Sequence, residues 1–281
     1  MRRRIFRGSA VVAAGTLTPK ELRGPAWRRL FRDIYACAEL PVTHQVRVVA
    51  AALLVPDAVV SGRSAAVLWG LPEAERDDEV ELTVPPGSTV SRVSGIRVRR
   101  RFLSPAQITR RGRIRVTTPE VTAIDLARTG SLESAVVLID RFVAEGVTDL
   151  VGVRSAAEEV TGKGCDQVRR AVALADGLAG SPQETRLRLL LHRSSLPPPV
   201  AQFVVRDDAG FVARVDFAWP GAKIAVEYEG AWHGDSPQQV AADRRRLNRL
   251  TAAGWTVIFV TAADLHRPEQ LVARLAAGLR R

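Results

Sequence analysis

The chain has 281 residues, enough for one large or two ordinary domains, and 46% of them are hydrophobic. No stretch approaches the ~18–20 apolar residues of a membrane span, and Cys37 and Cys165 lie too far apart in sequence to indicate a zinc knuckle or a disulfide framework. We therefore expect a cytoplasmic protein with no membrane partner, whose net charge of +11 attracts polyanions such as nucleic acid.

A basic module is predicted for residues 1–46. The first fifty residues contain ten basic and three acidic side chains. The run Thr18-Pro19-Lys20-Glu21 predicts the start of a helix, and a short strand is predicted at residues 33–36. These elements predict a reduced winged helix, and a packed N-terminal arm is the alternative.

A mixed α+β region is predicted for residues 47–180. Its first helices precede a group of strands that alternate apolar and polar residues, and a run of helices follows. The predicted elements are helices 45–54 and 62–71, strands 79–85, 95–101 and 113–117, and helices 121–128, 132–144, 150–160 and 166–178.

Positive charge is concentrated in this region at residues 82–119, which contain nine arginines and no acid. Such a stretch predicts contacts with the phosphates of a nucleic acid. An arginine-rich composition that only serves solubility is the alternative. The candidate nucleic-acid-binding residues here are Arg97, Arg99, Arg100 and Arg101.

An α/β domain with the element order α-β-β-β-α-β-α is predicted for residues 181–281. The run Ser181-Pro182-Gln183-Glu184 predicts a capped helix. The elements that follow are predicted as strands 201–206, 211–219 and 223–229, a helix from 236 to 253, a strand at 255–261 and a helix at 268–279.

Two of these strands carry acids on one face. Asp216 alternates with the apolar Val215 and Phe217, and Glu227 and Glu229 alternate with apolar residues in the next strand. A hairpin can therefore bring the three acids together. Carboxylates this close repel one another unless a cation neutralises them, and oxygen ligands suit Mg²⁺ or Mn²⁺. A solvated face of an edge hairpin is the alternative.

Histidine and arginine lie close to these acids in sequence. His233 follows the acidic strand and could act as a general base or acid. Arg244, Arg245 and Arg246 form a cationic run in the next predicted helix that could bind phosphate. Alternatively, this run is solvated, or it pairs with Asp243 or with the acid cluster.

Several ordered motifs within about residues 181–276 resemble the Vsr (very-short-patch repair) endonuclease superfamily, and more closely a family of Vsr-like proteins common in actinobacteria. The motifs are Val215-Asp216-Phe217-Ala218-Trp219-Pro220, Val226-Glu227-Tyr228-Glu229-Gly230, Trp232-His233, Asp243-Arg244-Arg245-Arg246 and Gly254-Trp255-Thr256-Val257.

This resemblance implies a PD-(D/E)xK, or restriction-endonuclease-like, fold. It implies that Asp216 and Glu227 bind the metal and that His233 is catalytic. Glu184 resembles the helix glutamate that these nucleases place near the metal, although a capping glutamate is expected at that position anyway. One departure is Glu229, which occupies the position of the usual lysine, and Lys223 is a candidate to replace that lysine.

A second resemblance covers the N-terminal two-thirds. The runs Val60-Ser61-Gly62-Arg63-Ser64, Val116-Thr117-Thr118-Pro119-Glu120 and Ala123-Ile124-Asp125-Leu126 are similar to the AbiEi-type antitoxin and transcriptional-regulator family. Such proteins join a winged-helix DNA-binding module to an α/β domain. This agrees with the positive charge of the N-terminal half.

These observations favour a Mg²⁺-dependent endonuclease that hydrolyses phosphodiester bonds of DNA in repair or defence. A double-strand cut would need two active sites, which a homodimer would supply. The first alternative is a DNA-binding regulator, similar to an antitoxin, that retains an inactive nuclease fold. The second is a structural or partner-binding protein with incidental charge.

Overall fold

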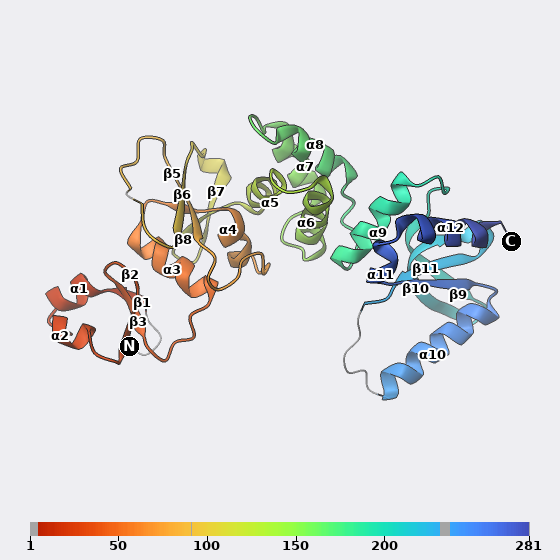
Figure 1. Cartoon of the computed structure of the whole chain (residues 1–281), viewed down its shortest axis with the longest axis horizontal. Coiled ribbons are helices and arrows are strands. Elements are labelled where there is room, and N and C mark those ends of the chain that lie inside the picture. Colours follow the sequence, from red (N-terminus) through yellow and green to blue (C-terminus); the bar gives the residue numbers. More distant parts are fainter. Residues whose placement is uncertain (1–4, 91, 231–236, 281) are drawn as a thin grey trace. The chain divides into compact units, whose positions relative to one another are not determined.

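Residues 5–90, 92–230 and 237–280 are described in the computed structural model of Figure 1. The protein is a mixed α/β molecule with three sheets. It divides into two compact units, and the three regions expected from the sequence stay a prediction. Unit 1 comprises Met1–Thr129 and Val151–Val168, and unit 2 comprises Gly130–Leu150 and Arg169–Arg281. None of the described helices is long and apolar enough to span a membrane.

Unit 1 begins with a three-stranded antiparallel sheet of order β1-β3-β2, and two short helices lie between its first and second strands in sequence. Thr18 caps the second helix, and Glu21 completes the capping box by accepting a hydrogen bond from the Thr18 backbone N–H. The elements are β1 (Ile5–Arg7), α1 (Gly8–Ala13), α2 (Pro19–Leu22), β2 (Trp27–Phe31) and β3 (Ile34–Cys37).

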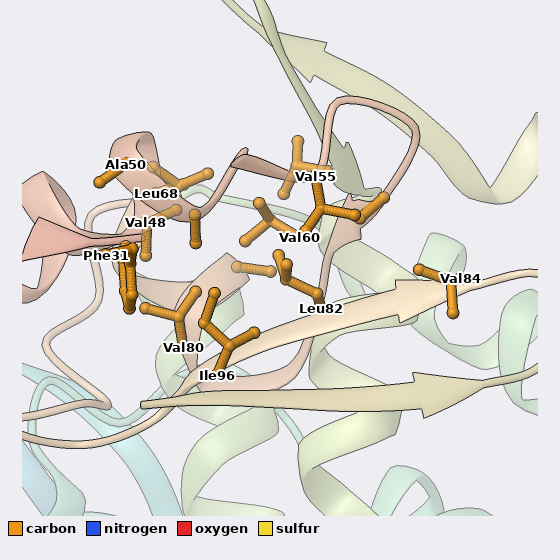
Figure 2. Packing of buried hydrophobic residues seen from close by; sticks show 14 of the residues in the cluster. Phe31, Val48, Ala50, Val55, Val60, Leu68, Val80, Leu82, Val84 and Ile96 are labelled. Atoms are coloured by element: carbon orange, nitrogen blue, oxygen red, sulfur yellow. The ribbon is translucent and has the colours of Figure 1, made fainter. Parts of the chain in front are cut away.

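A five-stranded sheet of order β6-β5-β4-β8-β7 forms the rest of the core of unit 1. Strand β5 is buried along its whole length because side chains such as Val80 and Leu82 pack with Val48 and Leu68 from helices α3 and α4 (Figure 2). The elements are α3 (His44–Leu54), β4 (Val59–Val60), α4 (Gly62–Leu68), β5 (Val80–Val84), β6 (Ile96–Arg100), β7 (Ile108–Arg111) and β8 (Ile114–Thr117).

A series of helices follows the sheet in the chain, and two of them, α6 and α9, pack against each other within unit 2. Asp140 in α6 is buried, and its carboxylate accepts hydrogen bonds from Thr185 at 2.8 Å and Arg188 at 2.7 Å. The helices are α5 (Pro119–Ala127), α6 (Leu132–Ala144), α7 (Leu150–Glu158), α8 (Cys165–Leu174) and α9 (Pro182–Arg193).

Unit 2 contains a four-stranded sheet of order β12-β11-β10-β9, in which only β11 and β12 are parallel. One apolar cluster joins the sheet to α9 and α12, and a second joins it to Leu250 of α10. The predicted order α-β-β-β-α-β-α is confirmed, with α11 added. The elements are β9 (Val200–Asp207), β10 (Gly210–Trp219), β11 (Ile224–Tyr228), α10 (Pro237–Ala252), β12 (Thr256–Val260), α11 (Ala262–Leu265) and α12 (Pro268–Leu279).

Strand β10 departs from simple alternation at Asp216. Val215 belongs to the apolar cluster that contains Leu250, whereas Phe217 belongs to the cluster with α9 and α12. The expectation that Val215 and Phe217 share one face is therefore wrong. The residue opposite Asp216 in the β9 register is Gln202, whose φ of 50° is rarely adopted by a residue other than glycine. The change of face on β10 thus lies beside a left-handed residue of β9.

Candidate acid cluster and nucleic-acid interface

Asp216 and Glu227 lie opposite each other on β10 and β11. The neighbouring pair, Phe217 with Val226, sets this register and is the last regular pair of the two strands on this side. The Asp216 carboxylate accepts a hydrogen bond from the Tyr228 backbone N–H at 2.8 Å. The structure thus brings together two of the three acids expected to meet.

The electrostatic environment of Asp216 is unusual for an aspartate. Burial raises its pKa to about 6, and the nearby charges of Glu184 and Glu227 add to the increase. Hydrogen bonds from the Tyr228 N–H and the Gln202 side chain oppose it. The carboxyl of Asp216 therefore holds its proton to a higher pH than an isolated aspartate does, and shifts of this kind are concentrated at functional sites.

Glu184 reaches this cluster from the first turn of α9. Its backbone N–H donates to the Ser181 hydroxyl at 3.2 Å, which confirms the predicted cap. Its carboxylate accepts from the Gly180 N–H at 2.8 Å, and the Gln202 amide donates to it at 3.4 Å. Sequence reasoning missed Gln202, because nothing in an apolar strand signals a left-handed residue that contacts two acids.

Glu227 already has a cationic partner. Arg246 of α10 donates to both of its carboxylate oxygens, at 2.5 and 3.0 Å, and also lies 3.4 Å from Asp243. This bidentate pair raises the pKa of Arg246. The Arg246 guanidinium pairs with the acid cluster, which is one of the alternatives given for this run, and phosphate binding by Arg246 stays a prediction. Arg244 and Arg245 lie exposed on the same helix.

The other candidate residues of this region lie elsewhere. Glu229 follows the end of β11 and is exposed, and its N–H donates to Val260 O at 2.7 Å. It therefore lies one residue beyond the strand on which it was expected, and its catalytic role stays a prediction. Lys223 precedes β11 and donates to Ala253 O at 3.0 Å. That it replaces the missing lysine stays a prediction. His233 lies outside the described residues.

The donor set does not fit a divalent metal ion as it stands. Within residues 5–90, 92–230 and 237–280, no three His, Cys, Asp or Glu side chains form a group that could hold one. Glu227 is only 12% exposed and is neutralised by Arg246. A metal would have to displace this guanidinium before both acids could bind it.

Exposed cations surround the short helix and the hairpin of the N-terminal module. Helix α2 and the residue after it provide two of them, and strand β2 with its turn provides three. All of these cations lie in the segment with the element order β1-α1-α2-β2-β3, in which two helices precede the β2–β3 hairpin. The exposed cations of this module are Lys20, Arg23, Arg28, Arg29 and Arg32, together called the N-terminal cationic face below. Because successive side chains of a strand alternate, Arg28 and Arg29 point to opposite sides of β2.

The four arginines predicted to bind nucleic acid near β6 mostly contact the protein itself. Arg97 lies 3.1 Å from Glu79 and Arg99 lies 3.3 Å from the buried Glu81. Arg101 forms a two-fold hydrogen-bonded ion pair with the buried Asp125, and Arg100 donates to Val90 O at 2.8 Å. Three of the four side chains thus pair with acids of their own fold, and their binding to nucleic acid stays a prediction.

The family relationships of the chain follow from comparison with known proteins. Residues 50–174 match the family model of the AbiEi antitoxin C-terminal domain. Over 221 residues the chain is 31% identical to uncharacterized protein Rv2248 of Mycobacterium tuberculosis (strain ATCC 25618 / H37Rv), and the match covers 78% of this chain and 80% of that protein. The chain belongs to the same family as Rv2248. Uncharacterized protein MT2308 of strain CDC 1551 / Oshkosh matches with the same identity and coverage.

The chain is also similar to a solved structure, the crystal structure of RV2827C protein from Mycobacterium tuberculosis. The two share 14% sequence identity at a TM-score of 0.42, over 73% of this chain and 84% of that one. The AbiEi match supports the antitoxin resemblance at residues 50–174. The Vsr-like resemblance of the C-terminal third stays a prediction.

The AbiEi-like motif at the start of α4 has a structural explanation. Gly62 opens α4 with φ of 55°, and a Cβ there would overlap the Glu81 carboxylate. The Ser64 hydroxyl accepts the Glu81 N–H at 2.8 Å and lies 2.8 Å from His44 Nε2. The run Ser61-Gly62-Arg63-Ser64 therefore joins α4 to β5 and need not bind a ligand.

Proposed function

We propose that this chain is a DNA-binding regulator of the antitoxin type. The observation that carries the proposal is the N-terminal cationic face, which directly precedes the segment that matches the AbiEi antitoxin C-terminal domain. Two helices followed by a hairpin form the arrangement with which winged-helix proteins contact DNA.

The dimensions of this module favour backbone contacts over extensive base contacts. Helix α2 has four residues, so it can present about one turn to a major groove. The exposed Arg28, Arg29 and Arg32 lie on β2 and its turn, where a wing would meet phosphates. Because phosphate contacts release counterions, the proposed binding depends strongly on salt.

A salt titration of duplex binding tests the proposal. We would measure the affinity of the whole chain for fluorescent duplex DNA and compare it with the triple variant Lys20→Gln, Arg28→Gln, Arg29→Gln. The slope of log affinity against log salt should fall by about 0.9 for each phosphate that the variant no longer neutralises.

A matched control removes the same charge from arginines that already pair with acids: Arg76→Gln, Arg97→Gln and Arg193→Gln. This control should keep the slope of the wild type. If the wild type does not bind duplex DNA, or if both triple variants change the slope equally, the N-terminal cationic face is not the interface.

A metal-dependent endonuclease is a second candidate. It is favoured by the position of Asp216 across from Glu227 with Glu184 nearby, and by the pKa of Asp216, which burial first and these two charges second raise to about 6. In that candidate Asp216 and Glu227 would bind Mg²⁺ or Mn²⁺, Glu184 would lie near the ion, and His233 would transfer protons. The Arg246–Glu227 ion pair argues against the endonuclease, because it already neutralises one of the two acids. The expected homodimer stays a prediction.

Plasmid cleavage separates the two candidates. Supercoiled plasmid would be incubated with the protein and Mg²⁺ or Mn²⁺, beside an Asp216→Asn variant and an EDTA control. Nicking or linearisation that is abolished in both controls would establish the nuclease. Intact plasmid together with retained duplex binding leaves the regulator and excludes cleavage under these conditions.

A further inference from the structure

An arginine-tipped hairpin projects at the edge of the five-stranded sheet. Strands β7 and β8 pair from Ile108↔Thr117 to Arg111↔Ile114, and β7 is the edge strand. Only Gly112 and Arg113 form the loop. Gly112 has φ of 60°, which suits a tight two-residue turn, and no atom outside its neighbours in the chain approaches its Cβ position within 4 Å. The tip is therefore narrow and open.

Four arginines decorate this hairpin, and the contacts described for three of them are with uncharged groups. Arg110 donates weakly to Arg113 O at 3.4 Å, and Arg115 donates to Asp57 O at 3.0 Å. The Arg111 guanidinium lies 5.2 Å from the ring centre of Trp69. The contacts described for Arg110, Arg111 and Arg115 are thus with two backbone oxygens and an indole ring, and none of these contacts is with a carboxylate.

Three arginines at β6 of the same sheet contact acids, so contacts with uncharged groups alone are not a general property of arginines in this sheet. Strand β6 contains Arg97 and Arg99, and Arg101 comes directly after it. All three pair with acids. On the hairpin, Arg110 lies directly opposite Arg115. Like charges placed opposite each other across two strands destabilise a sheet. A polyanion bound along the hairpin would remove that repulsion.

The shape of the hairpin selects among polyanions. A two-stranded ribbon fits the major groove of duplex DNA, and single arginines enter its narrow minor groove. The stacked Arg111 is held in place over Trp69, whose indole N–H donates to Thr117 O at 3.2 Å. An ordered guanidinium gives up less entropy on binding a phosphate than a free one does.

We propose that the β7–β8 hairpin is a second DNA-binding element, which inserts into a groove of duplex DNA with Arg110, Arg111 and Arg113 on the phosphates that flank it. It rests on the proposed function, because it requires that the chain bind duplex DNA. It adds a binding element within the segment that matches the antitoxin domain, separate from the N-terminal cationic face.

The test uses the whole chain and duplex DNA with the triple variant Arg110→Gln, Arg111→Gln, Arg113→Gln. The salt slope should fall by about 0.9 for each phosphate that is no longer bound. Between about 50 and 200 mM salt, the affinity of the wild type should therefore fall about 40-fold more than that of the variant. Hydroxyl-radical footprinting should show a shorter protected stretch of duplex. The double variant Arg110→Gln, Arg113→Gln keeps Arg111 over Trp69, so an effect in it cannot come from disturbed packing at Trp69.

The control variant with Arg76, Arg97 and Arg193 replaced by Gln should keep the wild-type slope and footprint. If the hairpin variants also keep both while the N-terminal variant binds more weakly, the hairpin proposal is overturned and the proposed function stands. The hairpin arginines would then only protect an edge strand from pairing. If the hairpin variants bind more weakly and the N-terminal variant does not, the hairpin proposal is supported and the N-terminal cationic face is not part of the interface. Absence of duplex binding by the wild type overturns both.

Discussion

The antitoxin-matched segment and the acid cluster of unit 2 both bury a carboxylate, but they surround it differently. Asp125 is 3% exposed and its charge is met by Arg101. Asp216 has a backbone N–H and an amide for partners, and the charges that act on it are those of Glu184 and Glu227. The first arrangement stabilises the fold. The second destabilises the ionised acid, and such arrangements are concentrated at functional sites.

Removal of the Asp125 carboxylate should have the largest effect. Asp125→Ala leaves the partly buried Arg101 without its partner, and breaking a buried pair in this way costs about 3–5 kcal/mol. Urea unfolding of the wild type and the variant measures the change. Asp77→Ala is the matched control, because Asp77 is exposed and pairs only at the surface. Equal stability of the two variants would show that the Arg101–Asp125 pair does not hold the fold.

Asp216→Asn should have a smaller effect of opposite sign. The folded pKa of about 6 lies above the ordinary value of 3.8, so the folded state binds the proton more tightly and its stability falls as the pH rises between these values. Above pH 6 the ionised acid should cost about 1–2 kcal/mol, discounted for partial exposure. The Asn variant should be more stable by that amount at pH 7.5 and gain nothing from this source below pH 3.8.

Thermal unfolding at a series of pH values measures this difference. The exposed Asp208→Asn is the control and should show no pH-dependent gain. If Asp216→Asn destabilises at pH 7.5, the ionised acid has a favourable partner and the contrast with Asp125 fails.

The exposed arginine of β6 should show the smallest effect. Arg97 pairs with Glu79, but their side chains are 51% and 47% exposed. Exposed ion pairs contribute about 0–1 kcal/mol. We expect Arg97→Gln to lower the urea midpoint only slightly. The shift should be smaller still at high salt, where surface charges are screened. A destabilisation as large as that of Asp125→Ala would mean that burial does not decide which pairs matter.

The element order of unit 2 was predictable because its strands and helices have clear apolar periods and capped starts, as at Ser181. The opposition of Asp216 and Glu227 followed from the hairpin between their strands. Short strands such as β4 and β7 were missed, since two to four residues carry too little pattern. The pairing of Arg101 with Asp125 spans 24 residues of chain, and the choice of Arg246 rather than its neighbours depends on the rotation of α10. Neither is encoded in local sequence.

The path of the chain through α6 and α9 constrains how the gene can change. Helix α6 lies within the antitoxin-matched residues, yet its Asp140 accepts hydrogen bonds from Thr185 and Arg188 of α9, beyond that match. A recombination event that exchanged everything after residue 180 would remove these partners and leave a buried acid with fewer donors. The antitoxin-like segment and the C-terminal third are therefore expected to be inherited together. Fusion of either part to a foreign sequence should give a folded protein only if the fused chain contains both α6 and α9.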